Sequence, residues 1–161
     1  MIRNGKWDGS KYSFKIIKRL IMVKGQCNCH AIAFEIKADI SDVYVCHCSI
    51  CRRSTGVNGI AVCVVDNQQF KWIKGKDLIR TWHKPDHDWQ TSFCQICGST
   101  LPGVNDNQRM YVPVGLITKG GENLKVAHHI WVDSKASWDK ICDEGTQHSK
   151  QFVNNNSSNA K

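Results

Sequence analysis

The chain has 161 residues, of which 41% are hydrophobic and 22% charged, as in one ordinary globular domain. Its apolar runs, such as residues 60–65, are too short to cross a bilayer, so we expect no membrane-spanning segment. The net charge is +8, but residues 1–24 hold seven of the 22 Lys and Arg and only one of the 14 acidic residues. Residues 25–161 therefore carry 15 basic and 13 acidic groups. A basic nucleic-acid-binding face on the domain is not indicated.

Composition divides the chain into three segments. We expect a basic N-terminal extension over residues 1–24, one domain over residues 25–150 and a polar tail over residues 151–161. The first 21 residues lack the apolar stretch of a secretory signal, so we expect a cytoplasmic protein. Two interpretations of this stretch stay open: an organelle-targeting peptide, or sequence that precedes a start at Met22.

Short strands dominate the predicted elements. Apolar and β-branched runs bounded by polar turns predict strands at residues 27–36, 59–66, 69–75, 78–83, 109–115 and 128–133. Pro113 favours an edge position for the fifth of them. Short helices are expected at residues 49–56, between a Ser49 cap and Gly56, and at residues 134–143. The sequence therefore predicts a single, mainly β domain with few short helices.

Seven of the nine cysteines fall into three groups. The groups are Cys27-x-Cys29, Cys46-x-Cys48-x-x-Cys51 and Cys94-x-x-Cys97. In the last, two intervening residues let both thiolates reach one ion, and the following Gly98 permits a tight turn. In the first, an extended segment would place both side chains on one face. In a reducing compartment, cysteines grouped in this way bind metal more often than they form disulfides.

Seven thiolates cannot complete two tetrahedral zinc sites, which need eight ligands. We therefore expect two zinc ions held in different ways. Two remote pairs would form a closed structural site: Cys27, Cys29, Cys94 and Cys97. The local triplet would hold a second zinc with one coordination position open, as catalysis requires: Cys46, Cys48 and Cys51.

Other interpretations of the cysteines stay open at this stage. They are a disulfide-linked or redox-switching domain, an iron–sulfur cluster, and a second zinc that is wholly structural. In the last case His47, His30 or Cys63 would supply the fourth ligand. His47 lies inside the triplet, but in an extended segment it points away from its neighbours, so we place it behind the ligands or at the surface. Cys63 is expected in the core, and Cys142 partly buried near a helix end.

An open site with three thiolates suits a thiol substrate. Its formal charge of −1 makes it a weak Lewis acid, but one that accepts a fourth soft ligand and lowers the pKa of that thiol. Arg52 and Arg53 follow Cys51 directly. They are candidate substrate contacts, because guanidinium groups bind carboxylates through paired hydrogen bonds. A solvated helix face is the alternative for each. His30, His47 and His129 are the candidate general bases.

The order of these motifs resembles a known family. The segments are "GQCNCHAIAFEI", "CHCSICRRSTG", "FKWIKG", "FCQICGSTL" and "HHIWVDSKASWDKI", spanning about residues 25–147. Together they resemble the glutathione-dependent formaldehyde-activating enzymes, also called the centromere-protein-V-like family. The three cysteine groups are the specific part of the match. Two positions depart from the family pattern: Asp88–Ser92, where an Arg usually precedes the second cysteine pair, and Leu116-Ile117 in place of Leu-Asp.

The resemblance implies an Mss4-like fold with two zinc ions. It implies a structural role for Cys27, Cys29, Cys94 and Cys97 and a catalytic role for Cys46, Cys48 and Cys51. It also implies a carbon–sulfur lyase that interconverts S-hydroxymethylglutathione with glutathione and formaldehyde, so the partners would be a small thiol and an aldehyde. The alternative function is a non-enzymatic two-zinc β scaffold that binds a protein or nucleic acid. A fourth protein ligand on the second ion would favour this alternative.

Overall fold

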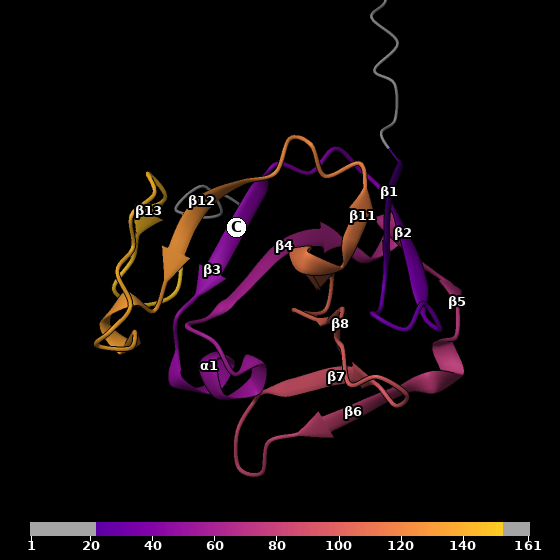
Figure 1. The fold of residues 1–161 in the computed structure, drawn as a ribbon, viewed down its shortest axis with the longest axis horizontal. Helices are drawn as coiled ribbons and strands as arrows, with labels where there is room; N and C mark the ends of the chain where they lie inside the picture. The colour runs from indigo at the N-terminus through magenta and orange to yellow at the C-terminus, as the bar shows by residue number, and fades with distance from the viewer. Residues whose placement is uncertain (1–21, 153–161) are drawn as a thin grey trace, which may run out of the picture.

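The computed structural model describes residues 22–152, and the expected N-terminal extension and tail lie largely outside this range. The described chain forms three β-sheets and one short helix (Figure 1). The expected mainly β single domain is confirmed. Residues 22–152 contain no helix long and apolar enough to cross a membrane.

The first sheet is antiparallel throughout and has the order β11-β1-β2-β5. Its strands are β1 (Met22–Gln26), β2 (Ala33–Lys37), β5 (Phe70–Lys74) and β11 (Ile117–Lys119). Buried side chains alternate along β2, because one face of the sheet covers the core. β1 begins at Met22, three residues before the expected start of the domain at Gly25.

The second sheet has the order β13-β12-β3-β4-β10-β9. Its strands are β3 (Asp42–Cys46), β4 (Ile60–Asp66), β9 (Gly103–Val104), β10 (Arg109–Pro113), β12 (Lys125–Ile130) and β13 (Thr146–Gln147). β12 runs parallel to both β3 and β13, and the other pairs are antiparallel. β10 is therefore no edge strand, but β9 pairs only with Met110 and Tyr111 and leaves one side of Pro113 uncovered by the ladder.

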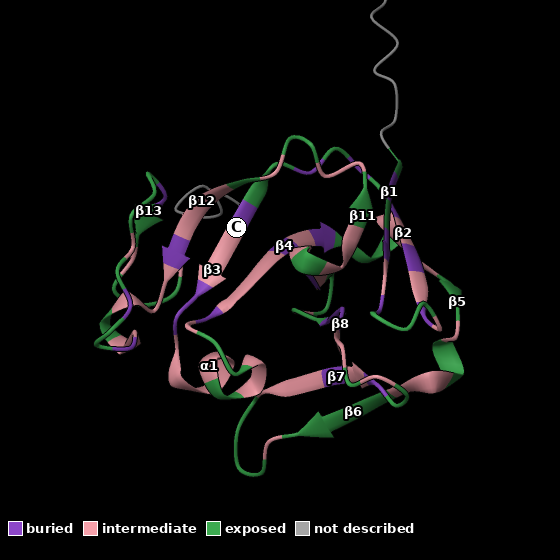
Figure 2. Ribbon diagram, viewed as in Figure 1, coloured by how far each residue is buried: buried purple, intermediate pink, exposed green. Residues whose placement is uncertain are grey.

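The third sheet is small, and a loop connects its first two strands. It consists of β6 (Ile79–His83), β7 (Gln90–Cys94) and β8 (Thr100–Leu101), in that order and antiparallel. Residues 84–89 connect β6 to β7. β6 is largely exposed, as Figure 2 shows. Single 3-10 turns precede β5, β6, β11 and the C-terminal segment: Asn67–Gln69, Lys76–Leu78, Val114–Leu116 and Val132–Ser134.

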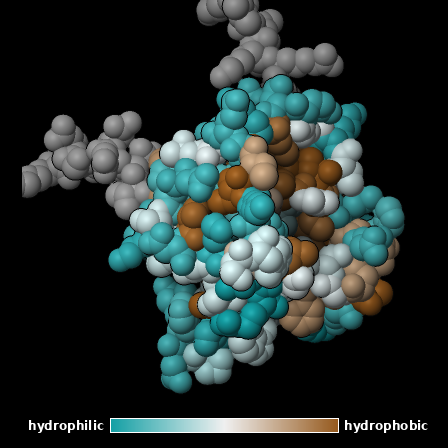
Figure 3. All heavy atoms as spheres, turned by 60° about the vertical axis from the view of Figure 1, so that its left-hand side comes forward, coloured by the Kyte–Doolittle hydropathy of each residue, from teal (hydrophilic) through white to brown (hydrophobic). Residues whose placement is uncertain are grey.

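The hydrophobic core divides into two clusters. The larger lies between the first and second sheets and contains buried Val23, Phe34, Ile36, Ala38, Ile40, Cys63, Val65 and Val112. The smaller surrounds the cysteine pairs and contains Cys27, Ile32, Cys94 and Leu101. Cys63 is 1% exposed, so its predicted place in the core is confirmed. On the face drawn in Figure 3, hydrophilic residues cover much of the surface and apolar ones come into view between them.

The helix α1 (Ser49–Thr55) is confirmed, with a different N-terminal cap. The cap is Cys48, whose Sγ accepts a hydrogen bond from the Cys51 N–H at 3.4 Å. At the other end Gly56 adopts a left-handed conformation (φ 75°), which glycine tolerates best, and its N–H donates to the Arg52 carbonyl. The helix is therefore limited to two turns.

Three expectations about local structure are wrong. Residues 27–32 form a turn between β1 and β2, and only residues 33–36 of the expected strand are extended. The predicted helix over residues 134–143 is absent, and Val132–Ser134 forms a single 3-10 turn instead. Cys142, predicted near a helix end and partly buried, is exposed. A helical spacing of apolar residues over only ten positions does not distinguish a helix from an irregular segment that tertiary contacts keep in place.

Gly25 provides a test of the larger core. It lies opposite Phe34 on β2, and a Cβ at this position would overlap the Phe34 ring, which is itself 1% exposed. We expect Gly25→Ala to lower the free energy of unfolding by about 1–3 kcal/mol, because the ring has little space into which to move. Urea unfolding measures this change.

The matched control is Gly115→Ala. A Cβ at Gly115 would have no neighbour within 4 Å. We expect this variant to unfold close to the wild-type midpoint. A Gly25→Ala protein as stable as the control would contradict the close packing of β1 on β2.

Candidate metal centres and the adjoining cavity

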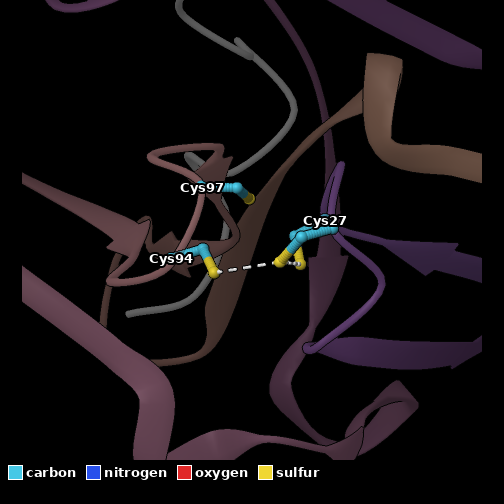
Figure 4. A group of neighbouring side chains, drawn as sticks. Cys27, Cys94 and Cys97 are labelled. Atoms are coloured by element: carbon cyan, nitrogen blue, oxygen red, sulfur yellow. Dashed lines mark hydrogen bonds between the residues drawn. The ribbon is translucent and has the colours of Figure 1, made fainter.

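The two remote cysteine pairs come together in the structure. Cys27 and Cys29 lie in the turn after β1, and Cys94 ends β7 next to the turn that carries Cys97. The sulfurs of Cys27 and Cys29 are 3.6 Å apart, and those of Cys29 and Cys94 are 3.9 Å apart. Figure 4 shows the side chains of Cys27, Cys94 and Cys97 converging from the two sides. All four sulfurs lie within 4.8 Å of one another. We refer to them as the four-thiol cluster.

Tight turns aim both pairs at the same point. The Ile32 N–H donates to the Cys27 sulfur at 3.3 Å, in a turn that the Cys27 N–H closes by donating to the Ile32 carbonyl. On the other side the Gly98 N–H donates to the Cys94 carbonyl at 2.8 Å, and Gly98 has a φ of 72°. The predicted role of Gly98 is thus confirmed. Cys27 and Cys29 converge through a turn, not through the expected strand.

Ser99 links the two halves of the four-thiol cluster. Its hydroxyl accepts a hydrogen bond from the Asn28 N–H at 3.0 Å and lies 3.2 Å from the Cys97 sulfur. The hydrogen bond from this hydroxyl, helped by backbone N–H groups, lowers the pKa of Cys97 to about 5. Cys97 is therefore readily ionised, as a metal-binding thiolate must be.

The four-thiol cluster has the dimensions of a tetrahedral zinc site. Zinc–sulfur bonds of about 2.3 Å place neighbouring sulfurs about 3.8 Å apart in a tetrahedron. The Cys27–Cys29 and Cys29–Cys94 distances of 3.6 Å and 3.9 Å bracket this value. Cys27 and Cys94 are 1% and 0% exposed and belong to the smaller core, whereas Cys29 is exposed. The residues present therefore fit a zinc ion.

The triplet forms a second cluster, which we call the three-thiol cluster. Cys46 ends β3, Cys48 caps α1, and Cys51 lies in the first turn of the helix. Their sulfurs lie within 4.8 Å of one another. One short strand-to-helix connection thus brings three ligand atoms to one point, and no distant segment is needed.

The thiols of this cluster compete for protons. Hydrogen bonds from Cys46 and Cys51 lower the pKa of Cys48 to about 2. The hydrogen bond to Cys48 in turn raises the pKa of Cys46 to about 11, and hydrogen bonds with both neighbours raise the pKa of Cys51. Three adjacent thiols cannot all ionise unless a cation offsets their charge, and a coordinated metal ion does so. This cluster too could hold a metal ion, and its donors are compatible with zinc.

His47 points away from the three-thiol cluster into a buried chain of hydrogen bonds. Its Nδ1 lies 2.9 Å from the Asp139 carboxylate, and its Nε2 lies 2.9 Å from His129 Nδ1. The chain continues from His129 Nε2 to Asp143 at 2.8 Å, and the Asn58 amide donates to Asp139 at 3.0 Å. His47 is 1% exposed. His47 thus lies behind the ligands, which confirms one of its two predicted positions. The other prediction, a position at the surface, is wrong.

The buried chain ties the C-terminal segment to the metal-binding connection. Burial lowers the pKa of His47, so this ring favours its neutral form despite the Asp139 carboxylate. The Asp143 pKa is lowered by its hydrogen bond from His129. Backbone pairing adds to the attachment, because the His47 N–H donates to the Ile130 carbonyl at 2.9 Å. Residues 131–145 are thus held against the connection between β3 and α1.

The two arginines after Cys51 have different surroundings. The Arg52 guanidinium donates to the Ser134 carbonyl at 3.1 Å, and its Nε is buried. The Arg53 side chain is exposed and lies 3.5 Å from the Ser49 hydroxyl. Arg52 therefore anchors the C-terminal segment to the helix, whereas Arg53 faces outward.

A cavity of about 730 Å³ opens beside the three-thiol cluster. Cys46 and Cys51 form part of its wall, together with Ser54, Ile60 and Tyr111. The end of β6 and the loop to β7 form another part and contribute His83, His87, Asp88 and Trp89. The loop before β10 contributes Asn105, Asp106 and Asn107. None of the four cysteines of the other cluster lines this cavity.

Besides Cys46 and Cys51, two ionisable groups of the cavity have shifted pKa values. Burial raises the pKa of Tyr111, so its hydroxyl keeps its proton and can donate a hydrogen bond. The hydrogen bond from Arg109 lowers the pKa of Asp106 to about 2, so this carboxylate stays ionised. Arg109 Nη2 and Nε both contact Asp106 Oδ2, the latter at 2.7 Å.

The histidines of the cavity differ from those that the sequence suggested. His47 and His129 are buried in the hydrogen-bonded chain, and His30 lies in the exposed turn near the four-thiol cluster with a φ of 61°. His83 and His87 line the cavity instead. A useful signal was present: "HKPDHD" between two apolar runs has the composition of a hairpin loop. The sequence did not identify Asp139 as the partner of His47, because its pattern predicts a helix over residues 134–143 and gives no sign of this contact.

Both departures from the expected family pattern have a place in the structure. Asp88, Gln90 and Thr91 line the cavity, so the first departure changes the wall of the candidate binding site. Leu116 and Ile117 pack against the core clusters instead. The second departure therefore concerns packing.

The fold and the two clusters define a small, mainly β protein with two thiol-rich sites that could hold metal ions, compatible with zinc. The family model of the glutathione-dependent formaldehyde-activating enzyme matches residues 22–134, and the chain belongs to this family. Its mainly β architecture is consistent with the Mss4-like fold expected for it. Membership supports a glutathione-dependent formaldehyde-activating function in general. A crystal structure of a Rhodobacter sphaeroides protein aligns at a TM-score of 0.49 and 21% identity, covering 58% of this chain and 85% of that one.

Removal of Asp139 should destabilise the domain. Asp139 is 5% exposed and accepts hydrogen bonds from His47 and Asn58. We expect Asp139→Ala to cost about 2–4 kcal/mol in the free energy of unfolding, because both partners would remain buried without an acceptor. Chemical denaturation measures the loss, and the exposed Asp133→Ala is the control. Equal stability of the two variants would contradict the structural role of the buried chain.

Proposed function

We propose that the protein is a zinc-dependent carbon–sulfur lyase that acts on a thiol–aldehyde adduct of the S-hydroxymethylglutathione type. The observation that carries this proposal is the position of the three-thiol cluster. Cys46 and Cys51 open onto a cavity large enough for a small peptide-like substrate, whereas no cysteine of the four-thiol cluster lines this cavity, and Cys27 and Cys94 are buried in the smaller core. Family membership supports the same reaction class.

The division of the cysteines follows from ligand number and from which cysteines line the cavity. In this proposal Cys27, Cys29, Cys94 and Cys97 hold a structural zinc, and Cys46, Cys48 and Cys51 hold a catalytic one. Zinc held by three thiolates would accept the sulfur of a substrate thiol and lower the pKa of that thiol. Because His47 is turned toward Asp139, it supplies no fourth ligand from within the triplet.

The side chains of the cavity wall would position the adduct and move its protons. Cleavage of the carbon–sulfur bond requires that the hydroxyl of the adduct lose a proton as the carbonyl forms, while the sulfur takes up the electron pair. His83 and His87 are the cavity residues of the type that exchanges protons near neutral pH. The Tyr111 hydroxyl can donate a hydrogen bond to the oxygen of the adduct, because its raised pKa keeps it protonated.

The proposal also assigns roles to the two arginines, names the substrates and places the protein in the cell. Arg52, bound to the Ser134 carbonyl, would act by positioning the helix, and Arg53 would be available to substrate. The substrates would be a thiol, of which glutathione is one, and an aldehyde. We also propose a cytoplasmic location, because thiolates persist in a reducing compartment.

Metal analysis tests the number of ions. We expect about two zinc ions per chain and a loss of folding in Cys94→Ser, because structural zinc contributes on the order of 10 kcal/mol to small domains. Elemental mass spectrometry of the purified protein measures the number of zinc ions per chain, and circular dichroism measures the folding of Cys94→Ser. A single zinc equivalent in wild-type protein would contradict the two-site arrangement.

Cys48→Ser tests the catalytic assignment. We expect this variant to keep the fold and one zinc ion but to lose turnover, measured by nuclear magnetic resonance exchange between glutathione, formaldehyde and their adduct. Cys142→Ser is the matched control, because Cys142 is exposed and lies outside both clusters. We expect it to retain both zinc ions and full turnover. Unfolding of Cys48→Ser would point instead to a second structural ion and a scaffold protein.

A further inference from the structure

A second, smaller groove adjoins the main cavity. It has a volume of about 390 Å³ and lies between α1 and the hairpin of β6 and β7. The helix contributes one wall and the hairpin the other, and the lining residues are Ile50, Arg53, Ser54, Trp82, Lys84, Trp89 and Thr91. We call it the side groove. The proposed chemistry beside the three-thiol cluster makes no use of Trp82 or Lys84.

The side groove and the main cavity adjoin and share part of their lining. Ser54, Trp89 and Thr91 line both of them. Ser54 lies one helical turn, about 5 Å, beyond Cys51 on the same side of α1. A substrate whose sulfur lies at the three-thiol cluster can therefore extend past the small Ser54 side chain into the side groove.

Charge differs sharply between the two spaces. The residues that line the main cavity include Asp88 and Asp106 but neither Lys nor Arg. Those that line the side groove include Arg53 and Lys84 but neither Asp nor Glu. Within residues 22–152 neither cation takes part in an ion pair, and the nearest polar contact of Arg53 is the neutral Ser49 hydroxyl at 3.5 Å. Both cations therefore remain available to an anionic ligand.

Two tryptophans give the side groove its apolar surface. The rings of Trp82 and Trp89 lie 6.2 Å apart at an angle of 67°, and Trp82 is 51% exposed. Exposed aromatic rings beside cations are typical of sites that bind the flat amide or aliphatic part of a ligand next to its charged end. Ile50 extends this surface.

We infer that the side groove binds a carboxylate of the thiol substrate, between Arg53 and Lys84, with the adjoining chain against Trp82 and Trp89. This inference rests on the proposed function and adds to it the place where a carboxylate of the thiol substrate binds. Arg53 and Lys84 act on substrate binding. The chemistry at the sulfur stays with the main cavity.

Calorimetry on the zinc-loaded full chain tests the inference without turnover. The probes are S-methylglutathione and its diethyl ester, in which two neutral ethyl esters replace the two carboxylates. We expect Arg53→Gln and Lys84→Gln each to weaken binding of the acid by about three- to tenfold, as for a lost hydrogen bond to a charged group at a partly exposed site. Binding of the ester should stay unchanged in both variants.

The control variant is Arg80→Gln. Arg80 is exposed on β6 and donates to the carbonyls of Asp77 and Ile79, away from both spaces. Its loss should leave binding of the acid unaltered. Equal affinity of wild-type protein for acid and ester would overturn the inference. So would an absence of measurable binding of the acid, or equal losses for both probes.

Ser54→Phe tests the passage between the two spaces. A phenyl ring at this position should raise the KM for glutathione by a larger factor than the KM for 2-mercaptoethanol, because the small thiol need not reach the side groove. Equal effects on both thiols would overturn the inference. A lack of turnover with every thiol would refute the proposed lyase, whereas the calorimetric comparison would still decide whether the side groove binds carboxylates.

Discussion

The crowding of thiols around two points is the constraint on which the structure depends. Thiolates repel one another, so sulfurs within 4.8 Å can be ionised together only around a cation. The four-thiol cluster takes one pair from the first sheet and one from the third, and these sheets share the smaller hydrophobic core. A metal ion bound there would hold two sheets together that share no strand. Packing and coordination would therefore act on the same junction.

The second cluster depends on a different kind of support. All three of its thiols come from one connection of six residues, which by itself would have considerable conformational freedom. The buried hydrogen bonds of His47 with Asp139 and His129 restrict this freedom on the side away from the cavity. The hydrogen bond from Arg52 to the Ser134 carbonyl restricts it at the helix. The polar residues beside the ligands thus serve to fix the backbone, which leaves the front of the cluster open toward the cavity.

The space in front of this cluster is divided by charge. The acidic groups and the histidines lie around the main cavity, and the cations and tryptophans lie around the side groove. Both halves use the same hairpin of β6 and β7, in which His83 ends β6, and Lys84 and Trp89 lie in the loop that follows. One loop therefore shapes both the place where protons move and the place where a substrate carboxylate would bind. Variation in this loop can change the thiol that is accepted while the cysteines remain the same.

The sequence by itself determined the composition of both clusters. Sulfur ligands are rare and their spacing is local, so the groups of cysteines could be recognised without a structure, and so could the short helix that ends at Gly56. The same applies to the core position of Cys63, because a cysteine inside an apolar alternating run has one favourable environment. The β-rich class followed from the short apolar runs and the turns between them.

Only the tertiary structure decided which other side chains face the clusters. Asp139 lies 92 residues from His47 along the chain, and the His83 loop lies more than 30 residues from Cys51. Such partners depend on long-range sheet pairing, and the local periodicity of a sequence does not predict this pairing. Residues 134–143 show the same limit, since apolar spacing suggested a helix while hydrogen bonds to distant partners hold an irregular path. Ligand identity is a local property of the chain, whereas the shape and charge of a cavity belong to the assembled fold.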